Sequence, residues 1–229
     1  TALEAAAGTA GAGGRITRAV AADALARRLP RYDKSGEEHY NLISALHKAV
    51  RGSDPDAALY WLARMLEGGE HPLYLARRLV RMAVEDIGLA DPQALTVAIA
   101  ARDAFDFLGS PEGDLALAEA AVYLATAPKS NRLHAGFGAA REAAQATPAA
   151  PVPLPIRNAP TGLMRELGYG EGYRYAHDSP DAYLAQEYLP AEVRGREFYL
   201  PGPFGFEKTI AERLRWWAEK RAAGTGKEE

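Results

Sequence analysis

The stretch GSDPDAALYWLARMLEGGEHP, from Gly52 to Pro72, decides the fold class. It contains one complete helix with both ends marked. Ser53 or Asp54 suits the N-cap, a proline suits the first turn, the run AALYWLARML is apolar, and two glycines stop it. We expect the buried side of this helix to include Leu59, Leu62 and Leu66.

The same helix start and stop signals recur on both sides of this stretch. Between these prolines, glycines and capping residues, apolar residues stand at spacings of three and four. A short helix ending near Gly8 opens the chain. We expect further helices over residues 17–28, 37–50, 72–87, 91–108, 111–128, 131–146, 161–167 and 204–221. The fold class is therefore all-α, and the short connections favour a helical bundle or collar.

Charged side chains are expected on the solvent-exposed faces of these helices. In the helix over residues 37–50, the apolar face leaves His39 outside. The pair Glu85-Asp86 is interpreted as solvated charge, because such pairs on helical surfaces are usually exposed. Arg81 lies one turn before Glu85 and is a ready ion-pair partner for it.

A proline-rich segment, TPAAPVPLPIRNAP over residues 147–160, interrupts the helical pattern. Proline removes a backbone donor and fixes φ, so the segment cannot continue a helix. We expect an extended strap. Because Val152, Leu154 and Ile156 alternate with prolines, the strap is expected to lie against the helical bundle.

Residues 161–200 form an irregular lobe that is rich in tyrosine and glycine, beginning TGLMRELGYGEGYRYAHDSPDAYLAQEYLP at Thr161. Its tyrosines can bury a large apolar face and keep a hydroxyl for a backbone partner; they are Tyr169, Tyr173, Tyr175, Tyr183 and Tyr188. His177 and Asp178 precede Ser-Pro and suit a local turn. We expect the lobe to be ordered and structural.

Composition sets limits on the class of protein. With 229 residues and 48% hydrophobic content, the chain can bury a real core, and the absence of cysteine excludes disulfides and thiolate metal sites. No apolar run reaches the ~20 residues that span a bilayer, so we expect no membrane association and a cytoplasmic protein. The formal net charge of -3 restricts any contact with DNA to local basic patches.

Three strings together resemble one family closely: residues 52–72, residues 161–190, and YLATAPKSN from Tyr123 to Asn131. The family is replication-associated recombination protein A (RarA, also called MgsA), AAA+ ATPases related to Werner-helicase-interacting proteins and clamp loaders. The resemblance covers residues 32–217. It implies that residues 1–30 are the remnant of an AAA+ lid, that residues 31–222 form a helical oligomerisation domain, and that residues 223–229 are a mobile tail.

The resemblance also implies a function. Family members carry a nucleotide-binding domain ahead of this region, and this chain has no P-loop: Gly224–Lys227 lacks the first glycine and the Ser/Thr of G-x-x-x-x-G-K-[ST]. We therefore expect no enzyme activity and no cofactor or metal in this chain, with ATP and Mg bound elsewhere in the parent protein.

The expected role is assembly of the parent into a homotetramer, a DNA-dependent ATPase that acts in rescue and recombination at stalled replication forks. Its implied partners are single-stranded or fork DNA and replication proteins such as single-strand-binding protein. The implied location is the nucleoid.

Basic side chains are the candidates for phosphate contact. Lys129 and Arg132 lie at a helix start, where N–H groups and positive side chains together suit a phosphate. Neighbouring helices supply Arg64, Arg77, Arg78 and Arg81. The alternative is that these arginines pair with nearby acids or bridge subunits. Tyr60 and Trp61 can stack on unpaired bases, although burial fits their apolar helix better.

Two other functions stay open at this point. The first is a module that grips single-stranded or fork DNA directly, with tetramer formation secondary. Alternatively the chain is an independent enzyme that uses the aromatic lobe as a pocket, for which only His177 and Asp178 offer acid/base chemistry.

Overall fold

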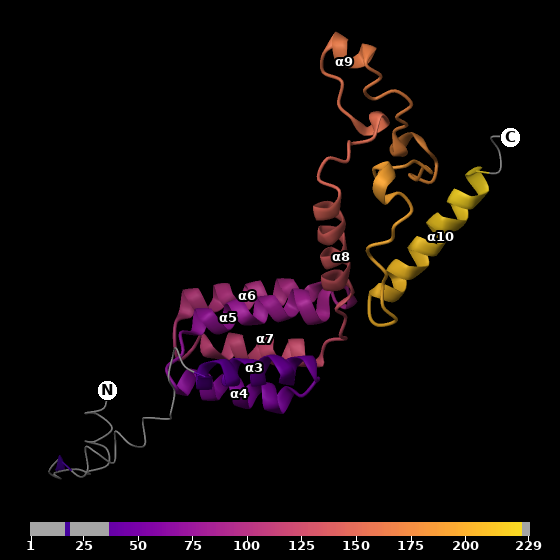
Figure 1. Ribbon diagram of the computed structural model, residues 1–229. Helices are drawn as coiled ribbons and strands as arrows, with labels where there is room; N and C mark the ends of the chain where they lie inside the picture. The colour runs from indigo at the N-terminus through magenta and orange to yellow at the C-terminus, as the bar shows by residue number, and fades with distance from the viewer. Residues whose placement is uncertain (1–16, 19–36, 226–229) are drawn as a thin grey trace. The chain divides into compact units, whose positions relative to one another are not determined.

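The computed structural model describes residues 17–18 and 37–225 (Figure 1). The expected helices before residue 31, apart from Thr17 and Arg18, lie outside these residues, as does the lid remnant. All regular secondary structure over residues 37–225 is helical, which confirms the all-α class. The chain divides into two compact units. The first contains the described residues up to Ile87 together with Pro92–Lys129, and the second contains Gly88–Asp91 and the residues from Ser130 onward.

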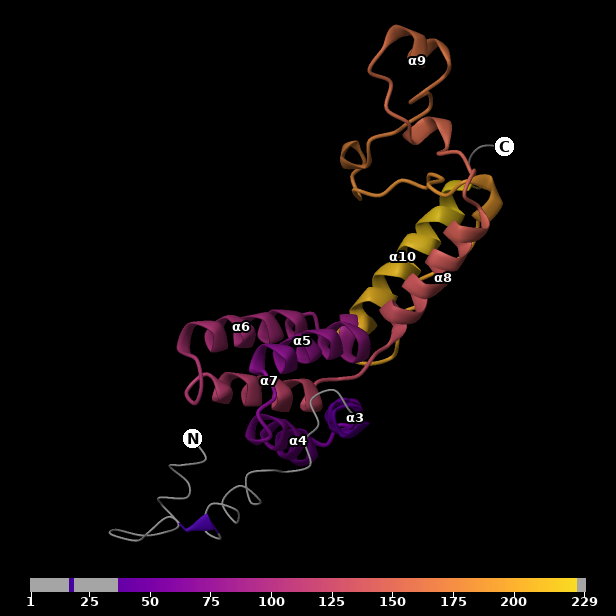
Figure 2. The same cartoon turned by 60° about the vertical axis from the view of Figure 1, so that its left-hand side comes forward.

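The first unit is a layered helical bundle. Its helices are α3 (Glu37–Arg51), α4 (Pro55–Glu67), α5 (Pro72–Met82), α6 (Gln93–Leu108) and α7 (Asp114–Thr126). Helix α7 contacts all four of the others, and it lies between a layer of α5 and α6 and a layer of α3 and α4 (Figure 1 and Figure 2). A helix in that position is buried over most of its surface, and only Leu115 and Glu119 of α7 are clearly exposed before its last residue.

Small residues let α7 fit between the two layers. Its fully buried side chains alternate leucine with alanine: Leu117, Ala120, Ala121, Leu124 and Ala125. Alanine lets neighbouring helix backbones approach closely. The alanine faces of α7 are therefore used inside this unit and do not remain free for a subunit boundary, although α6 keeps Leu95 and Phe107 exposed.

Helix α4 begins as the sequence predicts. The Asp54 side chain accepts a hydrogen bond of 2.9 Å from the backbone N–H of Ala57, and a proline occupies the first turn. The predicted buried face is only partly right, because Leu59 is 37% exposed. Leu62 is buried as predicted, Ala58 and Met65 are the other buried residues, and Leu66 is partly buried.

His39 is buried, contrary to prediction, and only 8% of it is exposed. Its Nδ1 lies 2.9 Å from a carboxylate oxygen of Glu70, and its Nε2 lies 3.2 Å from the hydroxyl of Tyr74. A buried polar ring is tolerated when such partners satisfy it. His39 also stands one turn before Leu42, on the face that the bundle covers.

The predicted helix over residues 72–87 is not regular to its end. The α-helical part stops at Met82 and continues as a π-helical turn, η1 (Ala83–Ile87), and then as a 3-10 turn, η2 (Gly88–Ala90). Gly88 has φ +52°, and the predicted stop at this residue corresponds to the change from the π-helical turn to the 3-10 turn.

The second unit has fewer helices and fewer buried apolar side chains than the first. It contains α8 (Arg132–Ala146), α9 (Gly162–Glu166) and α10 (Glu207–Thr225), with 3-10 turns η3 (Leu154–Ile156), η4 (Ala176–Asp178) and η5 (Ala191–Val193). Thr161 caps α9 through its side chain, as predicted. Helix α10 continues through Thr225, beyond the point where the tail was expected to begin.

The proline-rich strap contacts the aromatic lobe. The carbonyl of Leu154 accepts a hydrogen bond of 2.9 Å from Gly170 N, and the Arg157 guanidinium lies 4.9 Å from the ring centre of Tyr169. Val152 and Leu154 are exposed by 55% and 44%. The strap thus uses its backbone and Arg157 to hold the lobe. That it also lies against the bundle stays a prediction.

A buried carboxylate holds the second unit together. Glu207, in the first turn of α10, is fully buried and accepts hydrogen bonds from Ser130 Oγ at 2.7 Å, Gly202 N at 2.7 Å and the Tyr199 hydroxyl at 2.9 Å. Burial, followed by the bond to Glu207, raises the pKa of Tyr199 well above its usual value, so the phenol stays neutral and donates. Next to it, Phe206 N donates to the carbonyl of Ala90 at 2.8 Å.

The segment around Tyr199 also approaches α8 closely. A Cβ placed on Gly136 would clash with the carbonyl oxygen of Phe198, whereas a Cβ placed on Gly138 would meet no atom within 4 Å. Both glycines lie in α8. Only the first of them is required by packing.

Gly136→Ala and Gly138→Ala therefore form a matched pair. We expect Gly136→Ala to destabilise by about 1–3 kcal/mol, because the backbone of residues 198–199 must move away from α8. Gly138→Ala should stabilise by up to about 1 kcal/mol, because alanine favours a helix over glycine. Urea unfolding followed by circular dichroism measures both. Equal effects in the two variants would contradict this packing.

Candidate functional site

A buried charge cluster joins α3 to the π-helical turn. Asp86 is only 5% exposed. Its two carboxylate oxygens lie 2.6 Å from His47 Nε2 and 2.5 Å from Arg51 Nε. The prediction of a solvated acidic pair is therefore wrong for Asp86, but the predicted ion pair between Glu85 and Arg81 is confirmed.

Asp86 lies within the π-helical turn, seven residues after Leu79 and four after Met82, which are both buried. Seven residues are close to two helical turns, so Asp86 continues the buried face of α5. His47 and Arg51 are four residues apart in the last turns of α3, so both reach the same carboxylate.

The cluster is electrostatically balanced. Burial alone would raise the pKa of Asp86, but the hydrogen bonds to His47 and Arg51, together with the charge of Arg51, outweigh burial and hold that pKa below its usual value. The bond to Asp86 in turn raises the pKa of Arg51. The carboxylate is therefore ionised at neutral pH.

A cavity of about 250 Å³ lies beside the cluster, between α3 and α5. Its polar lining consists of Tyr40, Ser44, His47, Lys48, Arg51 and Arg78. The Arg78 guanidinium lies 3.2 Å from His47 Nδ1, and its Nε is buried with no hydrogen-bond partner among the described residues. Lys48 is exposed and has no ion pair in the same part of the chain.

Among the predicted arginine candidates, Arg78 alone lines this cavity. Arg64 lies 3.6 Å from the Glu38 carboxylate and over the Trp61 ring. Arg77 lies over the Tyr74 ring. Arg81 pairs with Glu85 as described. These three thus fit the alternative of local pairing. The prediction missed Lys48 and Arg51, although their spacing on α3 was available as a signal.

Lys129 is a helix cap in the structure. Its Nζ donates to the carbonyls of Ala125 and Ala127 at 2.9 and 2.6 Å, at the C-terminal end of α7. Burial lowers its pKa, against an opposing effect of Asp86. A cation at this end of a helix stabilises the helix dipole, and Lys129 uses two of its three N–H donors there. Arg132 is exposed and belongs to the other unit.

The aromatic residues of the first unit are divided between surface and core. Tyr60 is 56% exposed, whereas Trp61 is partly buried against the bundle core. Their rings meet edge to face with centres 5.0 Å apart. Of these two residues, only Tyr60 is placed where it can meet another molecule.

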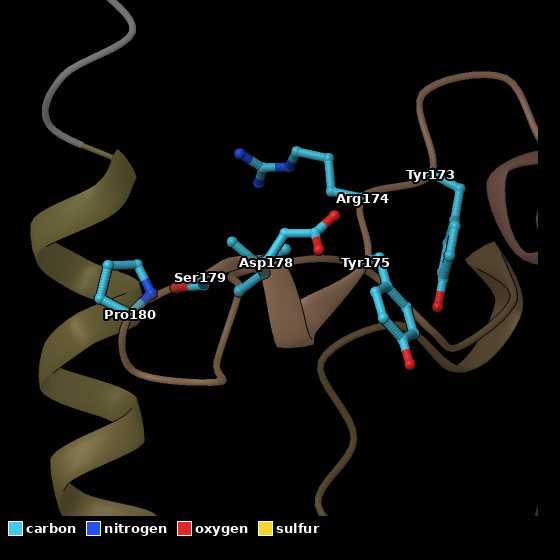
Figure 3. Close-up of a pocket in the computed structure, with 7 residues that line it drawn as sticks. Tyr173, Arg174, Tyr175, Asp178, Ser179 and Pro180 are labelled. Atoms are coloured by element: carbon cyan, nitrogen blue, oxygen red, sulfur yellow. The ribbon is translucent and has the colours of Figure 1, made fainter.

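The lobe contains an open pocket of about 490 Å³ (Figure 3). Its lining includes Tyr173, Arg174, Tyr175, Asp178 and Ser179. The expectation of buried rings holds only in part, because Tyr173, Tyr175 and Tyr188 are about half exposed and only Tyr169 and Tyr183 are partly buried.

Acid/base chemistry finds little support in the lobe. His177 and Asp178 are both exposed, and no hydrogen bond joins their side chains in the described structure. The His177 ring instead lies 5.0 Å from Tyr175. Over residues 37–225, no three acidic or histidine side chains are grouped to hold a metal ion.

Nor does any helix in the described part of the chain have the length and apolar content to cross a membrane.

Comparison with known proteins defines the class. Residues 1–51 match the family model described as the AAA C-terminal domain, and residues 52–218 match the model described as MgsA AAA+ ATPase C terminal. The class is thus the helical region that ends an AAA+ ATPase. More particularly, the chain belongs to the MgsA family, whose members include replication-associated recombination protein A.

Individual relatives support this assignment. Replication-associated recombination protein A of Haemophilus influenzae is 52% identical over 88% of this chain and 46% of the relative. The Escherichia coli K12 protein of the same name is 53% identical over 84% of the chain and 43% of the relative. ATPase WRNIP1 of Dictyostelium discoideum is 50% identical over 73% and 19%. The chain thus spans less than half the length of each of these relatives.

Removal of the buried charge should be costly. We expect Asp86→Asn to destabilise by about 3 kcal/mol at neutral pH, because His47 and Arg51 lose the carboxylate that compensates them. The control is Asp106→Asn on the exposed surface of α6, which should change stability by less than about 0.5 kcal/mol. Urea unfolding at pH 7 compares the two variants.

Acid should remove the same contribution. Because the folded-state pKa of Asp86 is depressed, its stabilisation is present above the unfolded value of about 3.9 and is lost as pH falls through the lower folded value. The difference between wild type and Asp86→Asn should therefore shrink below about pH 4. A difference that stays constant down to pH 2 would contradict the cluster.

Proposed function

We propose that this chain is the region through which an AAA+ ATPase of the replication-associated recombination family assembles into a homotetramer. The observation that carries the proposal is the poor self-burial of the second unit. Among its described residues, only Ala90, Ala143 and Val193 are buried apolar side chains. The first unit, by contrast, has a continuous core.

Large apolar side chains of the second unit are instead exposed. They include Leu163, Tyr173, Tyr175, Leu200, Phe204, Phe206, Trp216 and Trp217. A soluble protein rarely leaves so many large apolar groups in water unless a partner covers them. Closed homo-oligomers cover such surfaces without leaving an edge for further growth.

Helix α8 presents one such surface as a stripe. Leu133 and Phe137, one turn apart, are 40% and 65% exposed. The Arg141 guanidinium, one turn further, lies 6.0 Å from the Phe137 ring centre. An apolar stripe with an arginine beside it has the composition of a subunit interface.

The activity of the whole protein follows as part of the proposal. A preceding nucleotide-binding domain would bind ATP and Mg²⁺ and hydrolyse ATP in a DNA-dependent manner. The assembled protein would act at stalled replication forks, in rescue and recombination, within the nucleoid. Its partners would be single-stranded or fork DNA and replication proteins such as single-strand-binding protein. The family membership and the names of the relatives support this role.

Light scattering tests the assembly. We expect a mass near four times 24.6 kDa at micromolar concentration and moderate salt. Phe137→Glu should lower that mass, because a carboxylate in the stripe of α8 would be desolvated at the interface. The matched control is Phe107→Glu, which changes an 89% exposed ring of the first unit and should leave the mass unchanged.

A monomer at high protein concentration would refute the proposed scaffold. A tetramer that is lost in Phe107→Glu but kept in Phe137→Glu would move the interface to the first unit. Circular dichroism confirms that each variant is folded before its mass is compared.

Calorimetry tests the assignment of ATP chemistry to the preceding domain. Titration of ATP with Mg²⁺ into this chain should give no saturable heat at micromolar concentrations, because the P-loop motif is missing from the sequence. One-to-one binding with micromolar affinity would show a nucleotide site that the motif does not predict.

A further inference from the structure

We propose that the cavity between α3 and α5 is a phosphate-binding site, and that single-stranded nucleic acid is the source of the phosphate. The site lies wholly within the first unit. It does not depend on oligomerisation, which we assign to the second unit.

The charge of the cavity is the first argument. Lys48, Arg51 and Arg78 all line it. Asp86 is bonded to Arg51 and His47, and Glu85 pairs with Arg81 and lies 3.6 Å from Arg51. The acids of the neighbourhood thus neutralise Arg51 and leave Lys48 and Arg78 as uncompensated cations.

The unsatisfied guanidinium is the second argument. Arg78 Nε is buried and has no hydrogen-bond partner among the described residues, and the guanidinium lies 3.2 Å from His47 Nδ1. His47 can accept there because its Nε2 faces the Asp86 carboxylate. Buried donors without partners are rare, and they commonly mark a bound ion or ligand.

The number and direction of donors favour phosphate. A guanidinium, an ammonium and the Ser44 hydroxyl approach from two helices, and a phosphate offers several oxygens to accept from all of them. A volume of about 250 Å³ lies just below the usual range for small-molecule pockets, so it suits one phosphate group and its attachment.

The rim of the cavity favours a nucleic acid as the source. Tyr40 lines the cavity and is 66% exposed. Its ring packs edge to face on His39, with centres 5.4 Å apart, which fixes the ring at the surface. Proteins that bind single strands combine such aromatic platforms with cations that follow the backbone.

Fluorescence anisotropy with a labelled oligothymidylate tests the proposal on the full chain. We expect saturable binding at low salt, and about tenfold weaker affinity in Lys48→Met, because a charged hydrogen bond is lost. The slope of log K against log salt should fall by about 0.7 in that variant. Lys48 is exposed and forms no ion pair in the described residues, so its replacement should not disturb folding.

Arg78→Met should weaken binding by a similar factor. The matched control is Arg77→Met, the adjacent residue on α5, which does not line the cavity. Light scattering verifies that the variants keep the mass of the wild type, so that a loss of binding cannot be a loss of assembly.

Competition identifies the source of the phosphate. Sodium phosphate should displace the oligonucleotide more than sodium chloride of equal ionic strength does. If phosphate raises the Tm of wild type but not of Lys48→Met, and the oligonucleotide does not bind, the site holds phosphate from a free source and the nucleic-acid part of the proposal is wrong.

Three results would overturn the site itself. They are unchanged affinity in Lys48→Met and Arg78→Met, an equal loss in Arg77→Met, and absence of binding for both phosphate and oligonucleotide. Poly-glutamate that binds as tightly as the oligonucleotide, with the same loss in the variants, would show an acidic-peptide site instead.

Discussion

Close packing around α7 is the constraint on which the first unit depends. Because alanine and leucine alternate on its surface, four helices approach it from both sides. That layering sets the end of α3 against the π-turn that follows α5. His47 and Arg51 then meet Asp86, and the cavity beside them acquires its cations. A larger residue in place of Ala121 would separate the layers and the charges together.

The sequence predicted the helices more reliably than their faces. Local signals fix an end: the Asp54 side chain and the following proline start α4 without help from the rest of the chain. A buried face depends on neighbours as well. Ala58 is buried in place of Leu59, because the layers select the small side chain for close approach.

The candidate site was less predictable, for two physical reasons. Charged side chains are normally exposed, so the residue type argues against burial of Asp86, although a spacing of 3.6 residues places it on the face of the buried Leu79 and Met82. Burial of an acid also requires partners 35 and 39 residues away, in Arg51 and His47, which no local pattern reveals. Arg78 was recognised as a phosphate candidate only by its charge.

The second unit also depends on a contact between residues far apart in the sequence, which no local pattern reveals. Glu207 and Ser130 are 77 residues apart, and their bond closes a unit that has few buried apolar side chains. Hydrogen bonds are directional, so the hydrogen bonds of Glu207 can fix the path of the backbone without a large core. They leave the apolar side chains of the second unit uncovered. The basic cavity of the first unit therefore depends on electrostatic attraction, whereas the apolar stripe of α8 depends on the hydrophobic effect. Added salt screens the cations around Lys48 and strengthens burial of apolar residues such as Phe137, so anion binding and assembly should respond to salt in opposite directions.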